Sequence, residues 1–451
     1  MAGLKRPFRV AVEGNISAGK SSFLEYFKRY SNIDTYTEPI STWTNFKGNN
    51  LLELLYTDIK KWNFLFQNFV QLSRFKIQTS KPTNLNKNVQ IFERTLQSNR
   101  FCFGKMAFEQ GYLTHPEFLV NTKWYETLNE LEDISVDLIV YVRCSPETCF
   151  HRLKIRNRTE ETNVSLKYLQ DVHEIHDRWL ISPESEPCAP VLVLDAEKDI
   201  NELVLDYEKY KEYILGEKIY PSNIKYVEKT YPVLTKPMKN YQQICVEGNL
   251  SSGKSILLQN LQDNSLIECI QEPIDNWRDL EGFNLLKLLY SDLKRWNFLF
   301  RSYVQLTFLQ SHIKQNLNNT NNCKLFVMER SLYSNRYVFI EHAHKFGYLT
   351  KAEYDTLIAW FDVLIERCDV NIDHIVYIQS SPTLCLERLK KRGRPEEDNI
   401  PLEYLQQLHD FHEKWLTQSS INHTPLFIID SHRSEMQLVK DFEKRFIQNQ
   451  K

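Results

Sequence analysis

Two glycine-rich stretches of this chain have the residue types and spacing needed to bind phosphate. Residues 14–21 and 248–255 both match G-x-x-x-x-G-K-S, and each follows a short apolar run and precedes a helix-like segment. The glycines let the backbone aim several N–H groups at phosphate oxygens, the lysine reaches the β- and γ-phosphates, and the serine offers a hydroxyl to Mg²⁺. A single match could be a glycine turn, but coincidence does not explain two. The predicted phosphate ligands are Gly14, Asn15, Ser17, Ala18, Gly19, Lys20 and Ser21, and Gly248, Asn249, Ser251, Ser252, Gly253, Lys254 and Ser255.

A glutamate followed by proline recurs after each glycine-rich stretch. Glu38 and Glu272 each stand five residues before a tryptophan, Trp43 and Trp277. A carboxylate opposite a phosphate site can accept the proton of a hydroxyl that attacks the γ-phosphate. The same carboxylate would repel an acceptor that is already ionised. The pair therefore favours an alcohol acceptor over a nucleoside monophosphate, although an isolated Glu-Pro is also typical of a solvated turn.

A glutamate and an arginine close another apolar run in each half of the chain. Glu93-Arg94 and Glu329-Arg330 stand at these positions. A carboxylate at the end of a strand can orient Mg²⁺ through water, and an arginine can neutralise charge that develops during phosphoryl transfer. A surface salt bridge is the alternative, and the expected position at a sheet edge favours the functional interpretation. We predict Mg²⁺ ligation by Ser21, Glu93, Ser255 and Glu329, and catalytic roles for Glu38, Arg94, Glu272 and Arg330.

A basic segment that ends in two glutamates also occurs twice, at residues 151–161 and 387–397. Arginines four positions apart lie on one face of a helix. Three guanidinium groups on such a segment could close over a polyphosphate and exclude water. A solvated charged helix is the ordinary alternative, and the recurrence favours phosphate binding. The candidates are Arg152, Arg156 and Arg158, and Arg388, Arg392 and Arg394.

These landmarks repeat at a nearly constant offset along the chain. Gly14 and Gly248 differ by 234 positions, and Glu93 and Glu329 differ by 236. A long-period repeat of this kind indicates a duplicated domain and not a short-repeat solenoid. The predicted divisions are a first domain at 1–215, a proline-containing linker at 216–240 and a second domain at 241–451.

Short apolar, β-branched runs alternate with longer helix-like stretches in both copies. Near-continuous apolar strands separated by helices indicate a parallel sheet covered on both faces, an α/β fold whose ligands bind at the carboxyl ends of the strands. Phosphate-binding turns lie at that edge. The expected strands are at 8–12, 89–92, 136–142 and 191–194, and at 244–246, 324–328, 375–378 and 426–429.

The overall composition argues against several kinds of partner. Lys and Arg total 56 and Asp and Glu total 58, so the formal charge of −2 gives no reason to expect a nucleic-acid polymer or an anionic membrane surface. Nine cysteines without a C-x-x-C pair suggest free thiols in a reducing compartment. No run approaches the ~20 apolar residues of a membrane span. We therefore expect a cytoplasmic protein with neither nucleic acid nor membrane as a partner.

Taken together, the motifs resemble the deoxyribonucleoside kinase family, which includes deoxycytidine, deoxyguanosine, mitochondrial thymidine and multisubstrate kinases. G-N-I-S-A-G-K-S, E-P-x-x-x-W, E-R-[ST] and R-x-x-x-R-x-R-x-E-E carry the resemblance, which covers nearly all of both copies. It implies a P-loop kinase fold in which Glu38 is the general base on the deoxyribose 5′-hydroxyl, with Arg94 beside it. It also implies aromatic rings that stack the base, an amide at its edge, and a tyrosine and glutamate on the 3′-hydroxyl. The implied nucleoside-binding residues are Trp43, Tyr56, Phe66, Gln67, Phe103 and Glu161, and Trp277, Tyr290, Phe300, Phe339 and Glu397.

The first copy has the base-recognition pattern of one branch of this family, with one departure. Gln67 and Arg74 are similar to the residues of deoxycytidine and deoxyguanosine kinases, whereas thymidine-using relatives tend to have a smaller or apolar group in place of the arginine. Those cytidine and guanosine kinases pair the arginine with an aspartate, and this chain has Asn99 there. The resemblance implies that the first copy prefers deoxycytidine or purine deoxynucleosides.

The second copy departs further from the family pattern. Arg301 replaces the glutamine, Phe308 replaces the arginine, and Asn335 matches the asparagine of the first copy. A guanidinium group only donates hydrogen bonds, so Arg301 cannot reproduce both hydrogen bonds of an amide. We therefore expect a different or weaker base preference in the second copy.

The sequence thus predicts a tandem deoxyribonucleoside kinase of nucleotide salvage that transfers the γ-phosphate of ATP, with Mg²⁺, to the 5′-hydroxyl of deoxynucleosides. Family members are usually homodimers, so the two copies are expected to pair as an internal pseudo-dimer, with or without further self-association. Two alternatives stay open. One copy, more readily the second, could be a nucleotide-binding structural or regulatory module, or the protein could be a nucleoside monophosphate kinase.

Overall fold

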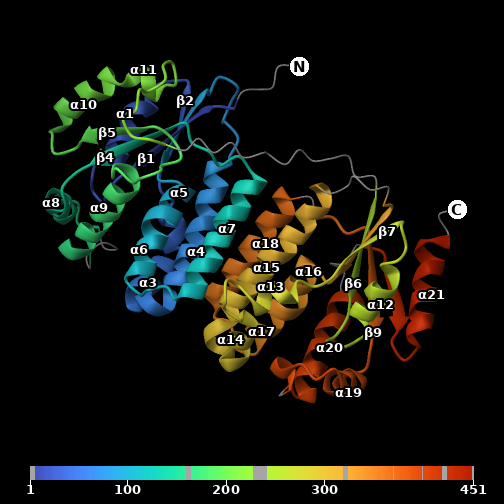
Figure 1. Cartoon of the computed structure of the whole chain (residues 1–451). Helices are drawn as coiled ribbons and strands as arrows, with labels where there is room; N and C mark the ends of the chain where they lie inside the picture. Colours follow the sequence, from blue (N-terminus) through green and yellow to red (C-terminus); the bar gives the residue numbers. More distant parts are fainter. Residues whose placement is uncertain are drawn as a thin grey trace. The chain divides into compact units, whose positions relative to one another are not determined.

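The protein is described by a computed structural model that covers residues 6–158, 164–226, 241–317, 323–368, 370–398, 400–418 and 424–448. The chain divides into two compact units, Met1–Leu234 and Thr235–Lys451. Each unit contains one five-stranded sheet with helices packed against it (Figure 1).

The sheet of the first unit consists of β1 (Phe8–Glu13), β2 (Ile33–Tyr36), β3 (Val89–Glu93), β4 (Leu138–Arg143) and β5 (Val191–Asp195). The order is β2-β3-β1-β4-β5, and every neighbouring pair is parallel. Val12 in the central strand is in register with Glu93 on one side and Val140 on the other. Because parallel strands end at the same edge of a sheet, the turns after β1 and β3 are neighbours. The phosphate loop therefore lies next to Glu93 and Arg94.

The sheet of the second unit consists of β6 (Gln242–Glu247), β7 (Ile267–Ile270), β8 (Leu325–Glu329), β9 (His374–Gln379) and β10 (Leu426–Asp430). Its order, β10-β9-β6-β8-β7, is the same topology read from the other edge, and again all pairs are parallel. The predicted strands fall within these elements or overlap them. The predicted α/β fold with a parallel sheet in two copies is confirmed.

The helices fill the intervals between the strands in both units. In the first unit they are α1 (Lys20–Lys28), α2 (Ile40–Thr44), α3 (Leu51–Thr57), α4 (Ile59–Gln78), α5 (Leu96–Ser98), η1 (Asn99–Phe103), α6 (Gly104–Glu109), α7 (His115–Leu131), α8 (Pro146–Arg156), α9 (Leu166–Leu180), α10 (Ile200–Lys209) and α11 (Lys211–Ile214). In the second unit they are α12 (Lys254–Leu261), α13 (Ile274–Arg278), α14 (Leu285–Ser291), α15 (Leu293–Leu317), α16 (Leu332–Ser334), η3 (Asn335–Ile340), α17 (Glu341–Lys345), α18 (Lys351–Arg367), α19 (Pro382–Arg392), η4 (Pro395–Glu397), α20 (Leu402–Leu416) and α21 (Glu435–Phe446).

The two faces of the first sheet bury different side chains because successive residues of a strand point in opposite directions. Val12 packs in one cluster with Phe23 of α1 and Leu203 of α10. Ala11 packs in another cluster with Leu180, at the end of α9. Both faces are therefore covered by helices, which explains why four of the six β1 residues are apolar.

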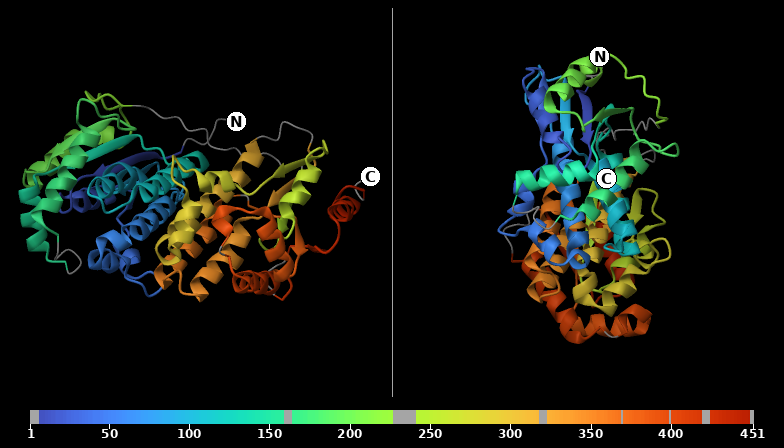
Figure 2. Two further views of the ribbon diagram at one scale, coloured as in Figure 1. Left: turned by 60° about the horizontal axis from the view of Figure 1, so that its bottom comes forward. Right: turned by 90° about the vertical axis from the view of Figure 1, so that its left-hand side faces the viewer.

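The second sheet is covered in the same way (Figures 1 and 2). On one face Val246 of β6 packs with Leu257 of α12 and Phe442 of α21. On the other face Tyr377 of β9 packs with Leu408 of α20. The duplication thus preserves the layers as well as the motifs.

Helix α4 carries many of the predicted nucleoside-binding side chains. The Asp58 side chain caps its first turn by accepting a hydrogen bond from the Lys61 amide, and the helix continues for 20 residues. Gln67 and Arg74 are seven positions apart, about two turns, so they lie on the same face of the helix. Helix α15 is the counterpart in the second unit and spans 25 residues.

Part of the predicted linker packs against the first unit. Tyr220 lies against the cluster that contains Val12, and Ile224 lies against the cluster that contains Ala11. Residues 227–240 lie outside the described part of the chain. The boundaries at 215 and 241 stay predictions. Within the ranges given above, none of the helices combines the length and apolar character of a membrane span.

Glycine is required where the phosphate loop crosses the neighbouring strand. Gly14 has a φ of 142°, and a Cβ atom there would lie 2.4 Å from the carbonyl oxygen of Val142. Gly248 has a φ of 146°, and its Cβ would lie 2.6 Å from the carbonyl oxygen of Ile378. Both the backbone conformation and the close approach exclude other residues.

We predict that Gly14→Ala destabilises the first unit and weakens ATP binding, because the loop must move away from β4. Gly111→Ala is the matched control, since Gly111 has a φ of 69° but a Cβ there would meet no atom within 4 Å. The control should cost only the left-handed backbone penalty of about 1–2 kcal/mol. Thermal unfolding and ATP titration of both variants measure the difference, and equal effects would contradict the steric argument.

Candidate active site

The phosphate loop of each unit leads directly into a helix that begins at its lysine. Lys20 is buried, and its Nζ donates to the backbone oxygen of Asn15 at 2.7 Å. Lys254 makes the same contact with Asn249 at 2.7 Å. Burial, together with the nearby Arg94, lowers the pKa of Lys20 to about 8. A polyphosphate would offer this ammonium group a stronger acceptor than the loop carbonyl.

Other loop residues hold the loop in shape. The Asn15 side chain donates to the backbone oxygen of Leu169 at 2.8 Å and accepts from the Ile16 amide at 2.8 Å, so it attaches the loop to α9. Ala18 is fully buried, and its amide donates to the Asn15 oxygen at 3.3 Å. Ser17 has a φ of 60° and lines the adjoining cavity. Of these predicted ligands, Asn15 and Ala18 therefore shape the loop.

The predicted Mg²⁺ ligands lie together in both units. Ser21 Oγ donates to Glu93 Oε1 at 3.1 Å, and Ser255 Oγ donates to Glu329 Oε1 at 2.8 Å. The described residues include no cluster of three or more His, Cys, Asp or Glu suited to a metal. One hydroxyl and one carboxylate fit Mg²⁺ nonetheless, because this ion usually keeps several waters and is completed by substrate phosphates.

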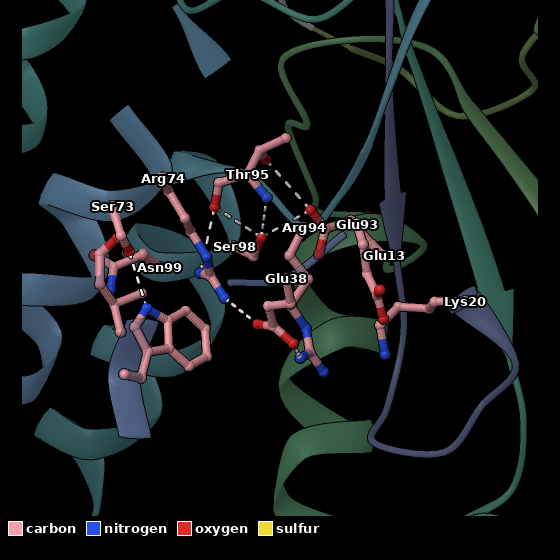
Figure 3. Close-up of polar contacts among 12 residues, drawn as sticks. Glu13, Lys20, Glu38, Ser73, Arg74, Glu93, Arg94, Thr95, Ser98 and Asn99 are labelled. Carbon is pink, nitrogen blue, oxygen red and sulfur yellow. Dashed lines mark hydrogen bonds and ion pairs between the residues drawn. The ribbon is translucent and has the colours of Figure 1, made fainter. Parts of the chain in front are cut away.

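The predicted catalytic carboxylate of the first unit, Glu38, is held by two arginines. Glu38 Oε1 accepts from Arg74 Nη2 at 2.6 Å, and Oε2 accepts from Arg94 Nη1 at 2.7 Å (Figure 3). Arg94 also donates through Nη2 to the backbone oxygen of Gly14 at 3.0 Å. Burial by itself would raise the pKa of Glu38, but Arg94 and Arg74 outweigh it and lower the pKa to about 2. Glu38 is therefore firmly ionised and is positioned beside the phosphate loop.

Among the described residues, one arginine lies within ion-pair distance of the equivalent carboxylate of the second unit, Glu272. Arg330 Nε lies 3.2 Å from Glu272 Oε1, but the contact does not have hydrogen-bond geometry. Phe308 occupies the position of Arg74, so the second guanidinium is absent here. Burial raises the pKa of Glu272, and Arg330 opposes the shift without cancelling it. The two copies thus have carboxylates of different basicity.

An aromatic cavity of about 840 Å³ adjoins the phosphate loop of the first unit. Trp43 and Phe66 meet edge to face with ring centroids 5.6 Å apart, and Trp43 Nε1 donates to Ser73 Oγ at 3.0 Å. Asn99 Nδ2 donates to Gln67 Oε1 at 2.7 Å, so it orients the amide. The predicted residues that line the cavity are Ser17, Lys20, Ser21, Glu38, Trp43, Tyr56, Phe66, Gln67, Arg74, Glu93, Arg94, Phe103, Arg156 and Arg158.

The second unit has a corresponding cavity of about 560 Å³. Trp277 meets Phe300 edge to face at 5.5 Å, and its Nε1 donates to Thr307 Oγ1 at 3.0 Å, which repeats the arrangement of the first unit. The amide of Asn335 donates to the backbone oxygen of Arg301 at 3.4 Å. The predicted residues that line the cavity are Ser251, Ser252, Gly253, Lys254, Ser255, Glu272, Trp277, Tyr290, Phe300, Arg301, Phe308, Glu329, Arg330, Phe339, Arg388, Arg392, Arg394 and Glu397.

Asn99, Asn335 and Arg152 are not among the described residues that line the two cavities. Asn99 contacts Gln67 of α4 instead, and Asn335 contacts Arg301, the equivalent residue of α15. Arg152 donates from Nη1 to Cys144 Sγ at 3.5 Å. Its counterpart Arg388 donates to the backbone oxygens of Ser252 at 3.1 Å and Ser431 at 2.8 Å. In the second unit this arginine therefore also supports the phosphate loop.

The basic segment is most fully described in the second unit. Arg392 Nη2 donates to Glu397 Oε2, and Arg394 Nη1 lies 3.6 Å from Glu397 Oε1. Tyr290 and Glu397 line the same cavity, as expected for a pair that grips one hydroxyl. Glu161, the predicted counterpart in the first unit, lies outside the described residues.

Sequence analysis missed two buried glutamates behind the phosphate loops. Glu13 and Glu247 immediately precede the first loop glycine and are fully buried. Glu13 Oε1 accepts from Ser98 Oγ at 2.8 Å and from Thr95 Oγ1 at 3.3 Å. Burial raises the pKa of Glu13 to about 7, although Arg94 opposes this. The repeated Val-Glu-Gly was the available signal.

Two tyrosines that line the cavities were also missed. Tyr168 of α9 lines the first cavity and Tyr404 of α20 lines the second. Both lie about one turn into a helix whose apolar pattern predicts only packing. Tyr168 and Tyr404 are 236 positions apart, the same offset as Glu93 and Glu329, and this repeat was the available signal.

Fold and site together define a P-loop kinase: a phosphate loop, a carboxylate beside it and an aromatic cavity are grouped at the carboxyl edge of a parallel sheet. The model of the family described as deoxynucleoside kinase matches residues 10–218 and 244–451. The chain belongs to this family, in a tandem arrangement, and is an ATP-dependent deoxynucleoside kinase.

Individual relatives match about one copy each. Mitochondrial thymidine kinase 2 of Homo sapiens is 38% identical over 203 residues, which is 45% of this chain and 75% of that protein. Mitochondrial deoxyguanosine kinase of Xenopus laevis is 36% identical over 217 residues, 42% of this chain and 82% of its own. Deoxycytidine kinase of Homo sapiens is 29% identical over 235 residues, which is 46% of this chain and 90% of that protein. The relatives thus differ in the nucleoside that they are named for.

We predict that the two copies respond differently to acid. A general base must be ionised, so a carboxylate with a raised pKa loses activity at higher pH than one with a lowered pKa. The acid-side fall of kcat/KM should therefore begin at higher pH in the Glu38→Gln chain, which retains Glu272, than in the Glu272→Gln chain, which retains Glu38. Initial rates measured as a function of pH give both profiles. Superimposable acid limbs would contradict the assignment.

Proposed function

We propose that both copies transfer the γ-phosphate of ATP to the 5′-hydroxyl of deoxynucleosides and so serve nucleotide salvage. The observation that carries the proposal is the same in each unit: a largely buried glutamate, a phosphate-loop lysine and an aromatic slot line one cavity. The relatives are named for nucleosides with different bases, so the base preferences below are part of the proposal.

The geometry supports in-line transfer with the glutamate as general base. The 5′-hydroxyl oxygen would form a bond to the γ-phosphorus while the bond from that phosphorus to the β–γ bridging oxygen breaks, and ADP leaves. The hydroxyl proton would pass to Glu38 or Glu272. Arg94 and Arg330 would offset the charge that develops between donor and acceptor. The arginines of the basic segments at 151–161 and 387–397 would offset the same charge.

Mg²⁺ bound with ATP would be held by Ser21 and Glu93, and by Ser255 and Glu329, and would supply charge neutralisation on the β- and γ-phosphates. Lys20 and Lys254 bind the same phosphates from the loop. In the first copy Arg94 contacts both Glu38 and the Gly14 oxygen, so it holds the proposed general base at a constant distance from the phosphate loop. This positioning is what phosphoryl transfer chiefly requires of the protein.

In the first copy, Trp43, Phe66 and Phe103 would stack the base while Gln67 contacts its edge. The amide of Gln67 can donate and accept, which suits a base edge that presents both kinds of group. Asn99 donates a hydrogen bond to the Gln67 side-chain oxygen, so it restricts the orientation of the Gln67 amide. Tyr56, with Glu161, is proposed to hold the 3′-hydroxyl.

The alternatives are less well supported. A structural second copy would have no need for Lys254, Glu272 and Arg330 in one cavity. A monophosphate acceptor would place a second anion beside Glu38, whose low pKa keeps it ionised. Pairing of the copies as a pseudo-dimer, further self-association and a cytoplasmic location stay predictions.

We predict that Glu38→Gln combined with Glu272→Gln abolishes turnover on all deoxynucleosides but leaves ATP binding intact. Loss of a general base typically lowers the rate by about 10²–10⁴-fold, and the amide keeps the shape of the carboxylate. Turnover is measured as ATP-dependent phosphorylation of nucleosides and of nucleoside monophosphates, with ATP hydrolysis as a further assay. Calorimetric titration measures ATP binding. Undiminished turnover in the double variant would refute the role of these glutamates, and preferential use of monophosphates by the unmodified chain would support the monophosphate kinase.

We predict that the first copy, measured alone in the Glu272→Gln chain, prefers deoxycytidine or purine deoxynucleosides over thymidine. The reason is the Gln67–Arg74 pair, because both side chains line the cavity and the Arg74 guanidinium carbon lies 5.8 Å from the ring centroids of Trp43 and Phe103, which would stack the base. The kcat/KM values for the four deoxynucleosides test this, with the doubly substituted chain as the blank. Thymidine as the best substrate would contradict it.

A further inference from the structure

The two copies place an arginine at different points on the same helix face. The first copy has Gln67 and Arg74 on α4, and the second copy has Arg301 and Phe308 at the equivalent points of α15. Each cavity thus contains one guanidinium from its long helix, but the group has moved by two helical turns. The consequences follow from what each arginine contacts.

Arg74 is used within the protein. Its Nη2 donates to Glu38 at 2.6 Å and its Nη1 donates to the backbone oxygen of Thr95 at 3.4 Å. The guanidinium and carboxylate neutralise each other, so neither needs a ligand to compensate its charge.

Arg301 has no such partner among the described residues. It is 7% exposed, lines the second cavity, and makes no ion pair with a described carboxylate, and its Nε lacks a hydrogen-bond acceptor there. Two aromatic rings lie close to it: the guanidinium carbon is 5.1 Å from the Phe300 centroid and 4.9 Å from that of Phe339. These rings hold the group among the residues that would stack a base.

A buried guanidinium without acceptors is costly, so a ligand that supplies them is strongly preferred over one that does not. Guanidinium donates only, and its planar fork fits two acceptors that lie side by side. Guanine presents such a pair at N7 and O6. Cytosine presents one at N3 and O2. Thymine alternates acceptor, donor and acceptor. In adenine the amino group lies between N1 and N7, and C2–H lies between N1 and N3, so neither base offers adjacent acceptors.

We propose that Arg301 is the specificity-determining residue of the second copy and selects deoxynucleosides whose base has two adjacent hydrogen-bond acceptors, deoxyguanosine or deoxycytidine, over thymidine and deoxyadenosine. The inference rests on the proposed phosphoryl transfer by that copy. It also makes the relation between the copies specific: the first reads the base with an amide, and the second reads it with a cationic fork.

The test uses the full chain with Glu38→Gln, which silences the first copy. In this background kcat/KM for deoxyguanosine or deoxycytidine should exceed that for thymidine and deoxyadenosine by about tenfold or more, the discrimination expected of one bidentate contact. Adding Arg301→Gln should remove that advantage mainly through KM, because the contact is to the base and not to the reacting atoms. The variant places in the second copy the residue that the first copy already has, so the cavity can accommodate it.

Two further comparisons sharpen the assignment. Arg301→Lys keeps the charge without the fork and should retain only part of the selectivity. Replacing deoxyguanosine by 7-deaza-2′-deoxyguanosine removes the N7 acceptor, so a loss of about tenfold identifies the guanine contact, whereas no loss with a strong preference for deoxycytidine identifies the cytosine contact.

Equal use of the four deoxynucleosides by the Glu38→Gln chain, or an unchanged profile after Arg301→Gln, would overturn the inference. If the Glu38→Gln chain phosphorylates none of them, the proposed activity of the second copy fails separately. Calorimetry then decides the recognition claim, because Arg301→Gln should weaken binding of deoxyguanosine or deoxycytidine to that chain and leave thymidine binding unchanged. Weakened binding supports the role of Arg301, and unaltered binding of all four refutes it.

Discussion

The site of the first copy depends on a largely buried carboxylate, that of Glu38, whose charge must be compensated by guanidinium groups. An ionised glutamate in the interior is stable only with close partners, and removing one partner of such a pair typically costs about 3–5 kcal/mol. Arg94 comes from the end of a strand and Arg74 from a long helix, so the sheet and the helix must both be in place before Glu38 can be ionised there. Arg94 also contacts the Gly14 carbonyl oxygen. One side chain therefore joins the base to the phosphate loop.

The second copy shows how far this arrangement can change while the fold stays constant. The loop glycine, the lysine and the strand-end arginine are retained, but Phe308 stands where Arg74 neutralises the carboxylate. Among the described residues, Glu272 consequently has one arginine, Arg330, within ion-pair distance, and its burial is less fully compensated. Arg330 has nitrogen atoms without hydrogen-bond partners among the described residues. A carboxylate that holds its proton more readily is the stronger base, so the loss of one arginine need not be a loss of function.

The sheet, the phosphate loops and the duplication could be predicted from sequence because their signals are local or repeated. Strand periodicity and the glycine spacing each occupy fewer than a dozen residues. Roles that depend on distant contacts could not be predicted in this way. Arg74 was expected at the base edge, and the structure shows that it contacts Glu38, because helix pattern alone does not tell which way a long side chain turns. Glu13 was missed since its partner Ser98 is 85 positions away. The hydrogen bond from Trp43 Nε1 to Ser73 Oγ likewise could not be predicted, because it forms only once the fold brings the two residues together.

The tandem arrangement has a consequence outside the chemistry of either site. Two sites encoded in one polypeptide are always synthesised in equal number, whatever the level of expression. Separate enzymes can be adjusted by making more of one and less of the other, but this chain cannot. Under the proposed function, a difference in output between the two copies must then be set by the turnover number and affinity of each site, to which the residues at positions 301 and 308 would contribute.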